Sequence, residues 1–267
     1  MKHYFTFTVL FILIGCSSSL TPVDDGLEKQ IFHFGNGSEP QGIDPHIVTG
    51  VPEHHILISL CEGLTIPSPN GNENLPGAAE SWTVSDDGKR YIFKLRKNGR
   101  WSNGDPVTAK DFVWSWQRIL TASLGSQYPD MLYYLEGAQE YHTGKTNDFD
   151  TVGVKAIGTH TLEVKLKAPT PFFTGLLSHY STWPVHKETV LKHGSIDDRN
   201  GEWTRPGNFV CNGAFNLQSW ELNNKIVVEK NPMYWDASKV QLNEIHYYPV
   251  SNVMTEDRMF RAGQLHV

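Results

Sequence analysis

The stretch that decides the fold is Arg96–Leu120, with the sequence RKNGRWSNGDPVTAKDFVWSWQRIL. Its middle, Asn103-Gly104-Asp105-Pro106, predicts a tight turn, because glycine tolerates a positive φ and proline disfavours helix in the residue before it. Thr108 can cap a following helix, with Asp111 three residues later as its capping-box partner. The apolar residues that come next recur at helical spacing: Phe112, Val113, Trp116, Ile119 and Leu120. The stretch therefore predicts a strand end, a turn and a helix with one buried face, and it holds no catalytic group.

Strands and helices are interspersed on both sides of this stretch. Residues 81–84 and 91–95 predict one β-hairpin, and residues 154–157 and 161–166 predict another. Further strands are expected at residues 30–34, 213–228 (two strands) and 245–250, and helices at 53–61, after Pro129 as far as 141, from 172 to 177 and at 255–262. This order predicts a mixed α+β fold rather than strict βαβ alternation.

The composition is that of an ordinary globular protein, with 39% hydrophobic and 19% charged residues and a net charge of −6. Basic residues are scattered, with no run or stripe, so we expect no nucleic-acid partner. The eight tryptophans could stack against sugars, but most fall within apolar patterns, and we expect them to pack in the core.

The N-terminus has the pattern of an export signal. Lys2 precedes the apolar run Phe5–Ile14, which is too short to span a bilayer but suits a signal-peptide core. The ending Leu13-Ile14-Gly15-Cys16 resembles a bacterial lipobox, in which Cys16 is lipidated and becomes the mature N-terminus. We therefore expect a signal peptide over residues 1–15, a lipid-anchored tether over 16–29, and a location in the periplasm or cell envelope. The alternative is an ordinary secretory signal with a chance cysteine.

Several motifs, in order, resemble those of one family. The run Trp101–Val113 is joined by these stretches: Ile43-Asp44-Pro45-His46, Gly50-Val51-Pro52-Glu53, Glu62-Gly63-Leu64, Leu75–Trp82, Asn212-Gly213-Ala214-Phe215 and Glu229–Asp236. Together they resemble the family 5 extracellular solute-binding proteins, the dipeptide- and oligopeptide-binding subunits of ABC importers. The resemblance covers roughly residues 30–265.

This resemblance implies a periplasmic-binding-protein type II-like lobe interrupted by a smaller inserted domain. The lobe would comprise residues 30–61 and 187–267, and the inserted domain residues 62–186. The second lobe of the family is missing, so the chain is expected to be the N-terminal portion of a binding protein. Residues 17–267 alone are then expected to bind peptides weakly or not at all, because the closing lobe buries most of the ligand.

The resemblance also implies where a ligand binds. Thr49, Gly50 and Val51 fall where the family's first lobe lines its peptide cleft, and Tyr128 matches a tyrosine that reaches the cleft from the inserted domain. An extended peptide can pair there by strand addition, which uses backbone groups and tolerates many side chains. The alternatives are a plain loop at 49–51 and an ordinary half-buried tyrosine at 128.

The remaining cysteines, Cys61 and Cys211, could pair in an exported protein, but their spacing does not show proximity. Cys61 ends an apolar run where the family carries an apolar residue, so we expect a buried free thiol. No CxxC or CxxH pattern indicates zinc.

The resemblance implies that the protein is a substrate-binding lipoprotein of a peptide ABC transporter. It would capture short peptides and deliver them to permease subunits. Its N-terminal lipid would attach it to the membrane. We expect no enzyme activity and no cofactor. One alternative is a metal- or haem-binding lipoprotein that uses Glu53-His54-His55, although adjacent histidines on a helix diverge by about 100°. Another is a truncated chain without function.

Overall fold

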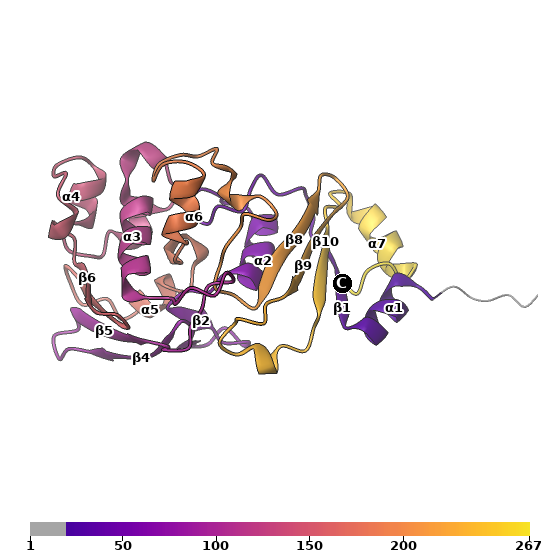
Figure 1. Ribbon diagram of the computed structural model, residues 1–267, viewed down its shortest axis with the longest axis horizontal. Coiled ribbons are helices and arrows are strands. Elements are labelled where there is room, and N and C mark those ends of the chain that lie inside the picture. The colour runs from indigo at the N-terminus through magenta and orange to yellow at the C-terminus, as the bar shows by residue number, and fades with distance from the viewer. Residues whose placement is uncertain (1–19) are drawn as a thin grey trace, which may run out of the picture.

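The computed structural model describes residues 20–267, so Cys16 and the predicted signal peptide lie outside the described residues. Two four-stranded sheets lie apart along the long axis of the molecule, with helices between and around them (Figure 1). The first sheet has the order β1-β10-β9-β8 and the second the order β4-β5-β7-β6. The strands are β1 Ile31–Gly35, β2 Thr65–Pro67, β3 Asn74–Pro76, β4 Ala79–Val84, β5 Arg90–Leu95, β6 Val154–Gly158, β7 Thr161–Lys165, β8 Phe215–Glu221, β9 Lys225–Lys230 and β10 Glu244–Tyr248.

The helices are short. They are α1 Pro22–Lys29, α2 Val51–Leu60, α3 Ala109–Leu120, α4 Ala138–His142, α5 Phe173–Leu176, α6 Lys187–Lys192 and α7 Val253–Arg261. Single 3₁₀ turns add η1 Ala122–Leu124, η2 Pro129–Leu132, η3 Phe149–Thr151, η4 Tyr180–Thr182, η5 Glu202–Thr204 and η6 Ala237–Lys239. None of the helices within residues 20–267 has the length and apolar character needed to cross a bilayer.

The predicted hairpins are confirmed. β4 pairs with β5 and β6 with β7, both antiparallel, and β8, β9 and β10 form an antiparallel meander. β1 joins the meander in parallel with β10. On its other edge β1 meets the last residues of the chain, where the His266 N–H donates to the His33 carbonyl over 2.9 Å. The mixed α+β class predicted from the sequence is therefore correct.

The stretch Arg96–Leu120 forms the turn and helix that its residues predict. Gly104 has φ +94°, and its N–H donates to the Trp101 carbonyl. The Thr108 N–H donates to the Asp111 carboxylate at 2.6 Å, so Asp111 provides a hydrogen-bond acceptor for this backbone N–H at the start of α3. The apolar face of α3 then packs against β6 and β7. Trp101 and Trp116 are 1% and 0% exposed, which confirms that they pack in the core.

Other elements differ from the sequence prediction. After Pro129 only the 3₁₀ turn η2 and the short α4 form, because Gly137 between them has φ +65° and breaks the helix. The helix α6 and the β2–β3 hairpin were not predicted.

The expected tether over residues 16–29 is wrong for its second half, which is the helix α1. Thr21 and Asp24 form a capping box, and Pro22 occupies the first turn, where proline is favoured. The helix packs against β1: a side-chain carbon at Gly26 would lie 2.7 Å from the Ile31 carbonyl oxygen, so only glycine fits there.

The prediction that Cys61 is a buried free thiol is also wrong. Cys61 and Cys211 form a disulfide, with Cα atoms 5.3 Å apart and a separation of 150 residues. The Gly213 N–H donates to the Leu60 carbonyl, and the Asn212 side chain exchanges two hydrogen bonds with the Glu62 backbone, so hydrogen bonds hold the segment before β8 against the end of α2. The long-range closure that creates this proximity is not visible in the spacing of the two cysteines.

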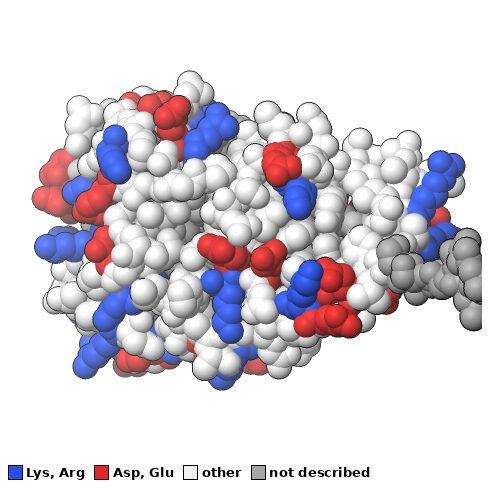
Figure 2. All heavy atoms as spheres, turned by 45° about the vertical axis from the view of Figure 1, so that its right-hand side comes forward, with Lys and Arg blue, Asp and Glu red and all other residues white. Residues whose placement is uncertain are grey.

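One large hydrophobic cluster extends through both sheets and α3, and Val185, Val190 and Trp203 form a smaller one. On the face in Figure 2, acidic and basic side chains are interspersed rather than gathered by sign.

Candidate functional site

Two of the residues predicted to line a ligand site, Thr49 and Gly50, lie in the loop between β1 and α2. Gly50 is the N-cap of α2, and Val51, which is 65% exposed, begins the helix. Glu53 turns back in the first turn, and its carboxylate accepts the Gln41 N–H at 2.7 Å. A side chain at residue 50 would meet that carboxylate, so Glu53 would have to move away from the Gln41 N–H to make room for it.

A buried ion pair fixes the same loop to α3. Arg118, which is 0% exposed, donates to both carboxylate oxygens of Asp44 at 2.9 and 2.6 Å. Burial opposes the charge on Asp44, but the Arg118 cation and its hydrogen bonds outweigh it and hold the pKa of Asp44 below its ordinary value. The loop is therefore held by a charged, two-bonded contact rather than by apolar packing alone.

His46 completes this contact as a neutral group. Its Nδ1 lies 3.0 Å from the Arg118 guanidinium, and its Nε2 lies 3.0 Å from the Trp183 carbonyl oxygen. Since arginine only donates, Nδ1 accepts and Nε2 carries the proton. Burial, and then the Arg118 charge, lower the pKa of His46 to about 4, which agrees with this tautomer.

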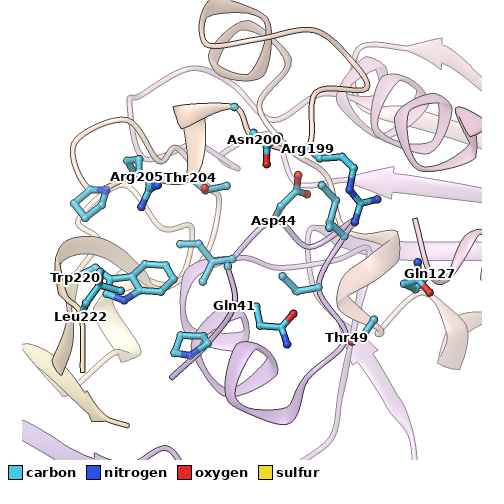
Figure 3. A pocket seen from close by; sticks show the side chains of 17 residues that line it. Gln41, Asp44, Thr49, Gln127, Arg199, Asn200, Thr204, Arg205, Trp220 and Leu222 are labelled. Atoms are coloured by element: carbon cyan, nitrogen blue, oxygen red, sulfur yellow. The ribbon is translucent and has the colours of Figure 1, made fainter. Parts of the chain in front are cut away.

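The outer side of the loop forms one wall of a pocket of about 720 Å³. Figure 3 shows Gln41, Asp44 and Thr49 along this wall, Trp220 and Leu222 on one side, and Arg199, Asn200, Thr204 and Arg205 along the far edge. The pocket thus joins four segments that are far apart in sequence: residues 40–49, Gln127, residues 199–206 and the tip of the β8–β9 hairpin. Thr49 and Gln127 face it, whereas Gly50, Val51 and Tyr128 are not among its lining residues.

Tyr128 packs against Tyr180, which is hydrogen-bonded to the loop. The Tyr180 hydroxyl donates to the Val48 carbonyl at 3.2 Å, and the Tyr128 ring lies edge-on to Tyr180, 6.3 Å between centroids. His54 on α2 packs against the same Tyr180 ring at 5.6 Å. The structure therefore gathers the Val48 carbonyl, Tyr128 and His54 around the Tyr180 side chain, and of these three residues Val48 lines the pocket.

The Glu53-His54-His55 group does not form a common site. Glu53 accepts from the Gln41 backbone, and His55 Nδ1 lies 3.1 Å from the Asn36 side-chain oxygen. Among residues 20–267 no group of three His, Cys, Asp or Glu side chains is arranged to hold a metal ion.

Three other sequence motifs, those that contain Glu62, Asn212 and Tyr234-Trp235, meet at the buried residue Glu62, away from the pocket. Glu62 accepts hydrogen bonds from the Tyr234 hydroxyl and the Trp235 indole N–H, and its backbone exchanges two hydrogen bonds with the Asn212 side chain. The Arg96 guanidinium lies 3.4 Å over the Trp235 ring. Burial raises the pKa of Glu62 to about 7 despite the two donors. These motifs hold segments together and do not line the 720 Å³ pocket.

Sequence reasoning missed the Arg118–Asp44 pair and the arginines of the pocket. The one available signal was Arg118 itself, a charged residue within the buried stripe of α3 that must have a buried partner. Arg199 and Arg205 lie in a segment without periodicity, and nothing in the sequence places it against the loop at 40–49.

Three comparisons place this chain among known proteins. The profile of the bacterial extracellular solute-binding proteins, family 5 (middle part), matches residues 74–267. The periplasmic oligopeptide-binding protein OppA of Escherichia coli K12 is 44% identical over 240 residues, which are 89% of this chain and 42% of that protein. A probable deoxycholate-binding periplasmic protein of the same organism, YgiS, is 38% identical over 239 residues, 89% of this chain and 43% of that protein.

A solved structure gives the same result for the fold. Haemophilus influenzae OppA in complex with the peptide RPPGFSPFR superposes with a TM-score of 0.84 at 38% identity, covering 89% of this chain and 45% of that one. The predicted resemblance and the periplasmic-binding-protein type II-like architecture are thus confirmed. The chain spans less than half the length of these relatives.

Proposed function

Because the chain belongs to family 5 of the bacterial extracellular solute-binding proteins, we propose that it is the peptide-capturing part of an ABC importer's substrate-binding subunit. It binds short peptides in extended form along the loop at Thr49–Val51 and performs no covalent chemistry. The family is one of binding proteins, and the peptide class comes from the relatives' names.

Unpaired backbone beside the pocket carries this proposal. Within residues 20–267 the Thr49 N–H and carbonyl and the Gly50 N–H have no hydrogen-bond partner, and Thr49 is exposed at the edge of the 720 Å³ pocket. Backbone groups are strong donors and acceptors, and a short row of unpaired ones on a fixed loop is what an added peptide strand needs. The buried Arg118–Asp44 pair holds this loop in place, so little order is lost on binding.

The pocket then accepts a peptide side chain while the backbone is held. Its wall mixes polar side chains with Trp220 and Leu222, a surface that tolerates several side-chain types with water filling the rest. Tyr128 contributes from beside the pocket, through its contact with Tyr180. Closure of a second lobe over the peptide, followed by delivery to permease subunits, is part of the proposal.

We also propose that Cys16 carries a lipid that anchors the protein to a bacterial membrane. The lipobox-like Leu13-Ile14-Gly15-Cys16 supports this. Radiolabelled palmitate incorporated into the wild type but not into a Cys16→Ala variant is the expected result, and equal labelling of both would contradict it.

The decisive test for function is calorimetric titration of the protein expressed from the complete gene with a mixture of tri- to hexapeptides. Deoxycholate, zinc and haem serve as competing candidates. We expect saturable binding of peptides only. Tight binding of zinc or haem that is lost on replacing His54 and His55, with no response to peptides, would overturn the proposal, as would binding of deoxycholate alone.

A further inference from the structure

We propose that the Arg199–Arg205 edge of the pocket is a carboxylate-accepting subsite, which makes the protein prefer peptides that place an acidic group there. This inference rests on the proposed peptide-binding function and names a ligand class for the same pocket.

Arg199 is fixed in place by the chain around it. Its guanidinium Nη1 donates to the carbonyls of Leu124 and Gly125 at 2.5 and 2.7 Å. These bonds occupy one nitrogen and leave the other guanidinium N–H groups unassigned among the described residues. A cation held in this way loses little side-chain entropy when it meets an anion.

Arg205 stands at the other end of the same edge (Figure 3). It lines the pocket, its side chain is exposed, and within residues 20–267 it has neither an ion pair nor a side-chain hydrogen bond. It follows the 3₁₀ turn η5, whose Trp203 is 2% exposed, so the backbone that carries Arg205 is anchored in the small hydrophobic cluster.

The pocket is positive although the chain as a whole carries a net charge of −6. Asp44 is the only acidic residue that lines it within residues 20–267, and both Asp44 oxygens are bonded to Arg118. Three nearby acids are not lining residues, and all accept hydrogen bonds: Asp197 from Ser123 and Ser195, Asp198 from the Asn200 N–H, and Glu39 from the Trp220 indole and the Asn223 N–H. The two arginines therefore leave an excess of positive charge facing the hollow.

The chemistry that fits this edge is a carboxylate at the end of an aliphatic stem. A guanidinium binds a carboxylate through two parallel N–H···O bonds, while Trp220 and Leu222 on the adjacent wall offer apolar surface for the methylene groups. Thr49 on the opposite wall is neutral and adds no repulsion. Such a carboxylate can be a glutamate side chain of the peptide or its C-terminus.

The test uses the protein from the complete gene and alanine pentapeptides. Glutamate is placed at each of the five positions in turn and compared with glutamine at the same position. Every peptide is made both with a free and with an amidated C-terminus. In the wild type we expect the acidic form to bind about tenfold more tightly than its neutral twin at one position, which is the scale of a hydrogen bond to a charged group. Moderate salt should reduce this ratio.

The variant Arg205→Gln should bring the ratio below about twofold, and Arg205→Lys should keep part of it. Arg258→Gln, on the exposed face of α7 and away from the pocket lining, is the matched control and should leave the ratio unchanged. If affinity falls when glutamate is replaced by glutamine, the ligand group is a side-chain carboxylate. If affinity falls when the C-terminus is amidated, the ligand group is the C-terminal carboxylate. Either result supports the subsite.

Binding of the neutral peptides with no preference for an acidic form, or with a preference that survives in Arg205→Gln, would overturn the subsite and leave the proposed function intact. Absence of binding by every peptide, neutral ones included, would overturn both. Thermal melting of each variant shows whether the fold is retained, so a loss of binding caused by unfolding is recognised.

Discussion

Arg118 and Asp44 lie 74 residues apart and form a buried ion pair through both carboxylate oxygens, at 2.9 and 2.6 Å. Arg118 belongs to the α3 helix and Asp44 to the loop that carries Thr49. The pair therefore connects the longest helix within residues 20–267 to the exposed backbone proposed to bind peptides. His46 and the Trp183 carbonyl extend this connection by two further contacts.

Removing one member of this pair should be costly, because the other is left as an unpaired buried charge. We expect Arg118→Met to lower the free energy of unfolding by about 3 to 5 kcal/mol, measured by urea denaturation. The double variant Arg118→Met, Asp44→Asn should be less destabilised than the sum of the single ones.

Arg90→Met is the control for that experiment. Arg90 and Glu163 also form an ion pair, but the Arg90 side chain is 55% exposed, so its loss should cost less than about 1 kcal/mol. Equal losses for Arg118→Met and Arg90→Met would show that the buried pair has no special role.

Glu62 should make stability depend on pH. Its ordinary pKa of 4.5 is raised by burial to about 7 in the folded state. Between these pH values the folded state keeps a proton that the unfolded state releases, so this carboxyl's contribution to stability falls as pH rises, by up to about 3 kcal/mol. The charged and titratable groups around it are Arg96, Asp236 and Tyr234.

The measurement is the free energy of unfolding of the wild type and of Glu62→Gln at pH 4.5 and 7. Glutamine keeps one oxygen to accept from Trp235, and the Tyr234 hydroxyl can rotate. Buried histidines such as His46 titrate in the opposite sense, and taking the difference between the two proteins removes their contribution. We expect the wild type to lose stability relative to Glu62→Gln on going to pH 7; a constant difference would show that Glu62 does not titrate in this window.

The Cys61–Cys211 disulfide closes a separation of 150 residues. In the chain-entropy account, constraint of so long a loop in the unfolded state stabilises the fold by about 2 to 5 kcal/mol. The double variant Cys61→Ser, Cys211→Ser should lose stability on this scale by urea denaturation. Dithiothreitol should destabilise the wild type and leave the variant unchanged; equal sensitivity of both would exclude the disulfide as the cause.

Gly213 should resist substitution more than most glycines. A side-chain carbon at residue 213 would lie 2.4 Å from the Leu60 carbonyl carbon and 2.6 Å from the Cys61 nitrogen, both backbone atoms that cannot move aside independently. We expect Gly213→Ala to cost about 1 to 3 kcal/mol. Gly42→Ala, where the nearest atom is at 3.6 Å, is the control, and a similar melting temperature for both variants would contradict the packing argument.

Local chemistry allowed much of the fold to be predicted from the sequence. The turn at Gly104, the cap at Thr108 and the hairpin of β6 with β7 depend on neighbouring residues, and all three are confirmed. The helix α1 depends on neighbours as well: Thr21, Pro22 and Asp24 carry its capping signal, although the position of the segment after the apolar run favours a tether.

The site was less predictable because its contacts are long-range. The family resemblance pointed to Thr49, but the pocket beside it also needs residues 199–206 and the hairpin tip at Trp220, which have no sequence pattern that links them to the loop. The Cys61–Cys211 disulfide escaped prediction for the same reason. The number of residues between two cysteines does not show whether the fold brings them together when they are 150 residues apart.

The most direct test of the central claim is amide hydrogen exchange of the protein from the complete gene, with and without saturating peptide. The account predicts slower exchange in the segment that contains Thr49 and Gly50 when peptide is bound, because their unpaired N–H groups then donate to the ligand. The β4–β5 hairpin, with its ladder already formed, should exchange at the same rate in both states. Peptide binding that leaves the Thr49–Gly50 segment unprotected would contradict the claim that this loop is the binding edge.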